Sequence, residues 1–284
     1  MKNVAHSVRQ RLLNRAKETG QPNDLVLVRY ALERLLYRLS VSAHAERFVL
    51  KGALLFTVWG QDDHRPTRDA DLLGFGSSDL AHLVAVFREV CAVPFEDGIV
   101  YDAASVEAEQ IAEDKAYVGA RVTFEAELAN ARIPVQIDVG FGDAVTPEPE
   151  TVEYPTLLDF PRPKLRAYPV HTVIAEKFHA MVVLGEDNSR MKDFYDLWAI
   201  SRRFGVEPSV LATAIAATFA RRKTELPKGT PIALGARFAG SAVKQRQWEA
   251  FVLRNRLSAK DVTLALTQEA IAALVMPAVE LARK

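Results

Sequence analysis

Two consecutive segments of alternating polarity constrain the fold of this chain more than any other feature of its 284 residues. In YVGARVTFEAEL (117–128), small and apolar residues take the even positions, and Arg121, Thr123 and Glu125 take odd ones. In RIPVQIDVGF (132–141) the apolar residues take the odd positions, and Asp138 lies on the polar side. A period of two is that of a strand with one buried face. Four residues, 129–132, would join the two strands, so the sequence predicts an antiparallel hairpin.

Helical patterns lie on both sides of this hairpin. Residues 1–45, residues 79–92 and the chain from His171 onward carry apolar residues at helical spacings. The segment FVLKGALLFTVWG indicates a short buried strand, a turn at Gly52 and a helix from Ala53, while residues 93–116 favour no element. The proline-rich stretch from Pro147 to Pro169 is typical of a segment that crosses between two bodies. We therefore expect a helical segment over 1–45, a core over 46–165 and a helical domain over 166–284.

The composition is that of an ordinary globular protein. Basic and acidic residues number 36 each, and 49% of the residues are apolar. The single cysteine, Cys91, has no partner for an internal disulfide. The most apolar segment, 262–282, is interrupted by Gln268, Glu269 and Pro277. The sequence thus predicts a cytoplasmic protein without a membrane partner.

Two aspartates stand two residues apart in a predicted strand, which places Asp69 and Asp71 on one face. Neighbouring carboxylates repel each other unless a cation lies between them, and Mg²⁺ is the usual cation at phosphate-transfer sites. Asp138 would be a third acid above the same sheet, and three such acids can hold two metal ions for in-line phosphoryl transfer. The competing interpretation is a solvated loop for the Asp69–Asp71 pair and an exposed acid on a half-solvated strand for Asp138.

The helical half carries further polar residues on apolar columns. Lys177 lies at the edge of the inward face of its predicted helix, where it can hold a triphosphate or extend along an apolar surface. Asp193 shares a column with Leu197 and Ile200, and Asp196 lies beside that column. An acid in this position needs a cationic partner, for which Lys177 or an arginine is available. A salt bridge that only ties two helices together explains the same pattern.

Charge is unevenly distributed over the chain. Between Arg221 and Arg256 there are nine basic residues and only two acidic ones. This excess indicates a surface for a polyanion such as RNA, although a solvated helical face has the same pattern. The RNA-binding candidates are Arg221, Arg222, Lys223, Lys244, Arg246, Arg254 and Arg256.

Several segments together resemble one family. FVLKGALLFTVWG, RPTRDADLLGFG, IPVQIDVGFGD, TVIAEKFHAM and NSRMKDFYDLW, with RYALERLLYRLS near the start, are similar to segments of the AbiEii/AbiGii-type nucleotidyltransferase toxins of bacterial toxin–antitoxin and abortive-infection systems, which include the MenT-type toxins. The similarity covers nearly the whole chain. It implies an α+β fold with a DNA-polymerase-β-like nucleotidyltransferase core, a mixed sheet, N-terminal helices and a helical C-terminal half.

The resemblance also implies roles for particular residues. Catalytic residues would be Asp69, Asp71, Lys177, Asp193 and Asp196, and the metal ligands, for two Mg²⁺ ions, Asp69, Asp71 and Asp138. The nucleotide-binding residues would be Lys51, Gly52, Ala53, Arg68 and Lys177. Many relatives carry Gly-Ser or Gly-Gly where this chain has Gly52-Ala53, so one hydroxyl contact to phosphate is absent and the backbone amides remain.

The implied reaction transfers a nucleoside monophosphate from an NTP to the acceptor end of tRNA and so blocks translation. The implied partners are tRNA, an NTP and an antitoxin encoded beside the toxin. In some relatives the antitoxin phosphorylates a Ser or Thr just ahead of the Asp pair, and Thr67 has that position here. A phosphate there would repel both the metal and the triphosphate.

Two other functions remain open on the sequence alone. One is a nucleotidyltransferase for small molecules such as aminoglycosides, and the basic segment favours RNA over such a polycation. The other is a catalytically silent binding protein of the same fold, which the retained Asp69, Asp71, Lys177 and Asp193 disfavour.

Overall fold

The computed structural model describes residues 2–60, 65–114, 117–257 and 262–284. The chain forms two compact units, one comprising residues 1–142 and 150–167 and the other residues 143–149 and 168–284. The N-terminal helices belong to the first unit. The chain passes between the units three times, and two of these passages lie within the proline-rich stretch from Pro147 to Pro169.

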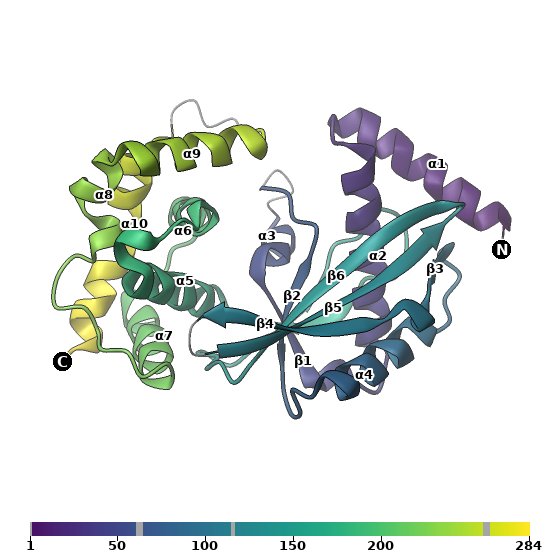
Figure 1. Ribbon diagram of the computed structural model, residues 1–284, viewed down its shortest axis with the longest axis horizontal. Helices are drawn as coiled ribbons and strands as arrows, with labels where there is room; N and C mark the ends of the chain where they lie inside the picture. The colour runs from purple at the N-terminus through teal and green to yellow at the C-terminus, as the bar shows by residue number, and fades with distance from the viewer. Residues whose placement is uncertain (1, 61–64, 115–116, 258–261) are drawn as a thin grey trace. The chain divides into compact units, whose positions relative to one another are not determined.

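The first unit is built on a mixed sheet (Figure 1). Its strands are β1 (Phe48–Lys51), β2 (Ala70–Gly74), β3 (Ile99–Tyr101), β4 (Glu107–Asp114), β5 (Tyr117–Leu128), β6 (Ala131–Phe141), β7 (Glu150–Glu153) and β8 (Lys164–Ala167). The order is β3-β5-β6-β2-β1-β8-β7, and β4 also pairs with β5. The pairs β2–β6 and β1–β8 are parallel and the others antiparallel. The predicted α+β class with a mixed sheet is confirmed.

Helices cover this sheet through their apolar faces. The helices of the first unit are α1 (Lys2–Thr19), α2 (Asn23–Ser40), α3 (Leu55–Val58) and α4 (Leu80–Ala92). α2 packs on β6 and β8, and α4 packs on β3, β4 and β5. The core between them contains Leu35, Leu39, Phe87, Val122 and Val139, all buried. Burial of these side chains on one face leaves the opposite face of β2, β5 and β6 for polar residues.

The predicted hairpin is present, but its loop is shorter than predicted. β5 and β6 pair from Ala120↔Val139 to Leu128↔Ala131, so only Ala129 and Asn130 form the loop. Both have positive φ values, 47° and 65°. Two consecutive residues with positive φ make the tight turn that matches the twist of paired strands. The prediction of a four-residue loop was therefore wrong, and the pairing register differs accordingly.

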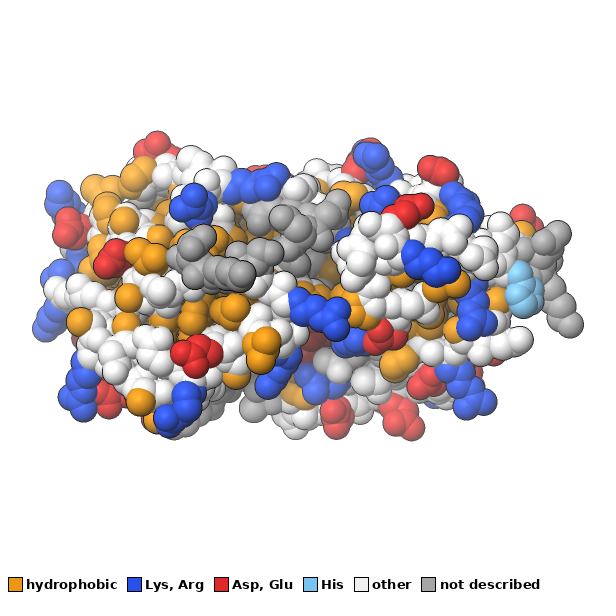
Figure 2. Space-filling model, turned by 90° about the horizontal axis from the view of Figure 1, so that it is seen from above, with side chains coloured by type: hydrophobic (Ala, Val, Ile, Leu, Met, Phe, Trp, Pro, Cys, Tyr) orange, Lys and Arg blue, Asp and Glu red, His pale blue; other side chains and the backbone are white. Residues whose placement is uncertain are grey.

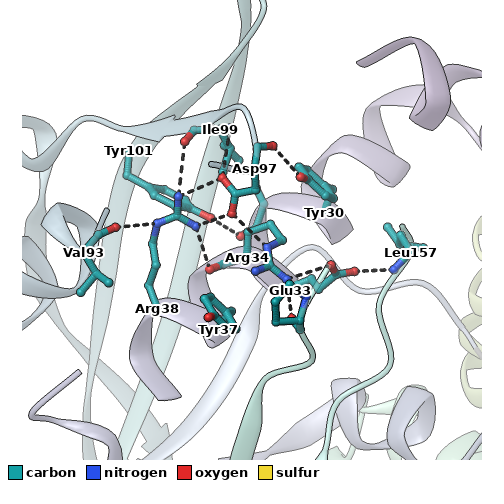
Figure 3. Close-up of polar contacts among 12 residues, drawn as sticks. Tyr30, Glu33, Arg34, Tyr37, Arg38, Val93, Asp97, Ile99, Tyr101 and Leu157 are labelled. Carbon is teal, nitrogen blue, oxygen red and sulfur yellow. Dashed lines mark hydrogen bonds and ion pairs between the residues drawn. The ribbon is translucent and has the colours of Figure 1, made fainter. Parts of the chain in front are cut away.

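A buried cluster of charged residues joins α2 to two loops of the first unit (Figure 3). Arg38 forms two hydrogen bonds with Asp97, at 2.7 and 2.9 Å, and Arg34 Nε forms a third at 3.0 Å. Glu33 Oε2 accepts a hydrogen bond from Leu157 N at 2.7 Å. Burial raises the pKa of Glu33 to about 7, against the lowering effects of the Leu157 amide and the Arg34 guanidinium. The cluster thus fixes α2 by charge as well as by apolar packing.

The second unit is helical, as predicted from His171 onward. Its helices are α5 (Val170–Leu184), α6 (Met191–Arg203), α7 (Pro208–Arg221), α8 (Ala236–Gly240), α9 (Ala242–Arg254) and α10 (Leu264–Ala282). α10 is long and apolar enough to cross a membrane by length and composition alone. It packs against α6 and α7, and Ile271, Val275 and Val279 are buried. These contacts are those of a core helix.

Candidate active site

A row of charged side chains crosses the sheet of the first unit at a single register. Lys51 of β1 is paired with Asp71 of β2, Asp71 with Asp138 of β6, Asp138 with Arg121 of β5, and Arg121 with Glu109 of β4. Paired residues project from the same face, and neighbouring strands lie about 4.8 Å apart. Two carboxylates, Asp71 and Asp138, are therefore neighbours in the row, and a cation flanks them on each side. The expectation that Asp71 and Asp138 lie together above one sheet is confirmed.

Gly52 allows the carboxylate of Asp71 to occupy this position. Gly52 follows β1 with φ +74°, and a Cβ atom added to it would lie 1.8 Å from Asp71 Oδ2. Only glycine tolerates both that backbone conformation and the close approach. Gly52 also begins the short 3-10 turn Gly52–Leu54, which leads into α3. The predicted strand and turn are present, the helix begins at Leu55 after the 3-10 turn, and the structure adds that the Asp71 carboxylate lies against Gly52.

Asp69 lies immediately before β2 and is contacted by a nearby hydroxyl. Thr67 Oγ1 donates a hydrogen bond to Asp69 Oδ1. The strand predicted to include Asp69 thus begins one residue later, at Ala70, and the contact places the Thr67 hydroxyl against the Asp69 carboxylate. The exposed Arg68 side chain instead forms an ion pair with Asp24 at 2.5 Å.

Both carboxylate oxygens of Asp138 are engaged by Arg121. Arg121 Nε lies 2.8 Å from Oδ1 and Nη2 lies 2.8 Å from Oδ2, which is a two-pronged ion pair. Gln136 Nε2 also approaches Asp138 Oδ1, at 3.3 Å. The hydrogen bond to Asp138 is the main cause of a raised pKa for Arg121, and Glu109 and Asp69 contribute electrostatically. Arg121 is thus a member of the candidate site that the sequence analysis did not assign.

The polar residues predicted in the helical half form a cluster within the second unit. Lys177 Nζ lies 2.6 Å from Asp193 Oδ1 and 2.9 Å from Asp196 Oδ2, and Arg190 Nε lies 2.7 Å from Asp193 Oδ2. Both aspartates are fully buried. Burial by itself would raise the pKa of Asp193, but Lys177 and Arg190 outweigh it and lower the pKa. The expected partners of Asp193, a lysine or an arginine, are both present.

The basic segment divides into structural and exposed residues. Arg222 contacts Asp143 at 2.9 Å, and Lys244 Nζ donates to the carbonyl of Asn188 at 2.8 Å. These two side chains are largely buried in internal contacts, so they offer little to a polyanion. The exposed candidates are Arg221, Lys223, Arg246, Arg254 and Arg256. On the face seen in Figure 2, Lys and Arg side chains are dispersed among acidic and apolar ones.

The residues of the first unit suit a hard divalent cation. Among the described residues, no group of three or more His, Cys, Asp and Glu side chains is placed to hold a metal ion. Mg²⁺ is commonly held by one or two carboxylates together with substrate phosphates and water, so a complete protein cage is not needed. The Asp71 carboxylate in the space left by Gly52, with Asp69 two residues before it, provides such a pair.

Comparison with known proteins identifies the class and the family. The model of the family described as nucleotidyl transferase AbiEii toxin, type IV toxin–antitoxin system, matches residues 34–275. That range covers most of the chain and both units, so this is a nucleotidyltransferase of the toxin class. The chain belongs to the AbiEii toxin family, as its resemblance to that family predicted.

Two solved structures from Helicobacter pylori are similar to the chain. One is described as a candidate nucleotidyltransferase, with 14% identity, a TM-score of 0.48 and coverage of 88% of this chain and 92% of that one. The other is JHP933, with 14% identity, a TM-score of 0.47 and coverage of 88% and 90%. No curated protein matches the chain.

Proposed function

We propose that this chain is a Mg²⁺-dependent nucleotidyltransferase toxin that transfers a nucleoside monophosphate from an NTP to the 3′ acceptor end of tRNA in the bacterial cytoplasm. The observation that carries the proposal is the placement of Asp71 against Gly52 and beside Asp138. This arrangement combines a glycine turn, which phosphates can approach closely, with the Asp71 carboxylate, which can hold a metal together with Asp69. Membership of the AbiEii family supports the class of reaction.

The reaction forms one bond and breaks another at the same phosphorus. The terminal hydroxyl oxygen of the RNA bonds to the α-phosphorus, the α–β phosphoanhydride bond breaks, pyrophosphate leaves and the hydroxyl proton passes to water. Mg²⁺ held by Asp69 and Asp71 would neutralise charge that develops on the phosphates. The backbone at Gly52 and Ala53 would position the triphosphate, together with Lys51, which precedes Gly52, and Arg68, which precedes Asp69. Addition of a nucleotide to the acceptor end blocks aminoacylation, which accounts for toxicity.

Lys177 would provide a point charge for the triphosphate, as its match to the AbiEii family implies. Asp193 and Asp196 hold its ammonium group at 2.6 and 2.9 Å. Because two buried carboxylates hold the ammonium group, the lysine has one position, from which it can make a defined contact with the substrate. The exposed basic residues Arg254 and Arg256 would contact the RNA backbone.

The family implies a cognate antitoxin, and we propose Thr67 as the position at which it acts. The hydroxyl of Thr67 already contacts Asp69. A phosphate on this oxygen would place a dianion against a proposed metal ligand, which weakens binding of the triphosphate by repulsion.

The test is transfer of label from each of the four NTPs, with Mg²⁺, to total tRNA and, separately, to an aminoglycoside. We expect label in RNA from the wild type, and loss of transfer in Asp71→Asn. Asp159→Asn is the matched control, because the Asp159 side chain is 97% exposed and pairs with Arg11 at the surface. Labelling of the aminoglycoside and not of RNA would overturn the choice of substrate. Equal transfer by Asp71→Asn and the wild type would overturn the site.

A further inference from the structure

We propose that Arg121 contacts a phosphate of the bound nucleotide, and that Asp138 positions Arg121 instead of binding metal. The inference rests on the proposed function, since it assigns two residues of the same site. It departs from the expectation that Asp138 is the third metal ligand.

The ion pair with Asp138 fixes the orientation of the Arg121 guanidinium. Nε and Nη2 of Arg121 point at the two oxygens of Asp138, both at 2.8 Å. A guanidinium has five N–H donors in a fixed plane. The pair uses two of them, so three N–H groups remain to donate to another acceptor. Because the carboxylate holds the plane of the guanidinium, those three have a defined direction.

Arg121 also lies beside the proposed metal site in the sheet. Arg121 and Asp71 flank Asp138 at one register, so all three side chains project from the same face of the sheet. The Arg121 side chain is 34% exposed and interacts electrostatically with Asp69. An accessible cation beside the proposed metal pair is suited to an oxyanion that also contacts the metal, and a nucleotide phosphate is such a group.

The surroundings of Asp138 do not favour a metal ion. A cation on Asp138 would have to replace a two-pronged ion pair, and it would then lie next to the displaced guanidinium. Asp138 is also approached by Gln136 at 3.3 Å, and its side chain is only 13% exposed. Asp71, whose carboxylate lies against Gly52, and Asp69 two residues before it remain the pair proposed for the metal. The guanidinium of Arg121 therefore supplies the positive charge that a second metal ion supplies in a site with three carboxylate ligands.

Metal binding separates the two roles of Asp138 without any measurement of activity. Mn²⁺ is titrated into the full chain, with and without a non-hydrolysable NTP analogue, and the free ion is followed by electron paramagnetic resonance. We expect Asp138→Asn to bind Mn²⁺ within about threefold of the wild type, and Asp71→Asn to bind it more than about tenfold more weakly. Arg121→Gln should bind Mn²⁺ more tightly, because it leaves Asp138 ionised beside Asp71. The double variant Arg121→Gln/Asp138→Asn should lose that gain, and it leaves no charge unpaired if a single variant is unstable.

Steady-state kinetics test the contact with the nucleotide. We expect Arg121→Gln to raise the KM for NTP by about 10- to 100-fold. Asp138→Asn should raise the KM less. Arg121→Lys should restore only part of the affinity for NTP, because a lysine cannot form the two-pronged ion pair with Asp138.

The outcomes distinguish this inference from the proposed function. Loss of Mn²⁺ affinity in Asp138→Asn equal to that in Asp71→Asn would make Asp138 a ligand and overturn the inference alone. An unchanged KM in Arg121→Gln would also overturn it. A wild-type protein that binds no Mn²⁺ with nucleotide present would overturn the proposed function, and this inference with it.

Discussion

Gly52→Ala should remove activity at a modest cost in stability. The added Cβ would lie 1.8 Å from Asp71 Oδ2, whereas ordinary van der Waals contact begins at 3.4 Å. The Asp71 carboxylate would therefore have to move by about 1.6 Å, the difference between these two distances. A misplacement of about 1 Å at a reacting centre can reduce the rate about 100-fold. The positive φ at position 52 adds about 1–2 kcal/mol of backbone strain for any residue with a Cβ.

A second glycine of the same unit provides the matched control. Gly20 has φ +65°, close to the +74° of Gly52, but a Cβ added there meets nothing within 4 Å. Gly20→Ala should therefore have a similar strain without displacing a carboxylate. Urea unfolding should show a loss of about 1–2 kcal/mol in both variants. NTP-dependent labelling of RNA should fall about 100-fold or more in Gly52→Ala alone. Activity of Gly52→Ala within threefold of that of Gly20→Ala would show that catalysis does not depend on this position of the Asp71 carboxylate.

Four further predictions concern separate features of the chain. Lys177→Met should lower the free energy of unfolding by about 3–5 kcal/mol, measured by urea denaturation, because it leaves two buried carboxylates without their shared cation. Thr67→Glu should weaken Mn²⁺ binding and transfer, whereas Thr67→Val should retain both, since only the former places a second carboxylate against Asp69. Arg254→Gln with Arg256→Gln should weaken tRNA binding and reduce its dependence on salt concentration, as measured by filter binding at several ionic strengths. Glu33→Gln should make the free energy of unfolding less dependent on pH. The pKa of Glu33 is about 7 in the folded state against an ordinary value of 4.5, so between these pH values the folded state binds a proton that the unfolded state has lost. The stability of the wild type should therefore fall by about 3 kcal/mol relative to the variant as the pH rises through this range.

Each of these predictions has an outcome that contradicts it. Full stability of Lys177→Met would mean that Asp193 and Asp196 are compensated by other groups. Equal loss of function in Thr67→Val and Thr67→Glu would assign Thr67 to the structure of the strand entry. An equal loss of tRNA affinity in the surface control Arg162→Gln/Lys164→Gln would mean that the effect of the basic segment is not local. A stability difference between Glu33→Gln and the wild type that is the same at pH 5 and pH 8 would exclude titration of Glu33.

The hairpin shows why the sequence analysis missed Arg121. The strands and their buried faces were correct, because alternation alone identifies them. The loop was placed at four residues, 129–132, which would pair Leu128 with Ile133 and shift the register by two. The observed loop of two residues pairs Leu128 with Ala131, and so pairs Arg121 with Asp138. Ala-Asn lacks the glycine of the commonest tight hairpin turns, and no local signal distinguished the two lengths.

Residues 93–116 could not be assigned from their own composition. β4 has the sequence EAEQIAED, in which acidic residues are frequent and apolar ones scarce. Such a segment has low intrinsic β-propensity, and its pairing with β5 decides its structure. The roles of Lys177, Asp193 and Asp196 came from the resemblance to the family. Spacing alone had left a structural salt bridge as an equal explanation, and the observed ion pairs are compatible with both.

The charge row depends on topology, which explains why spacing arguments identified its parts but not the whole. Asp71 and Asp138 are neighbours only because β2 and β6 pair in parallel, although three strands separate them in the chain. Two adjacent carboxylates would repel each other, but Lys51 and Arg121 flank them at the same register. Within a row of this kind, replacement of one member changes the charge balance of its neighbours. The role of Asp138 therefore cannot be separated from that of Arg121, and a variant of either residue is interpretable only beside the double variant.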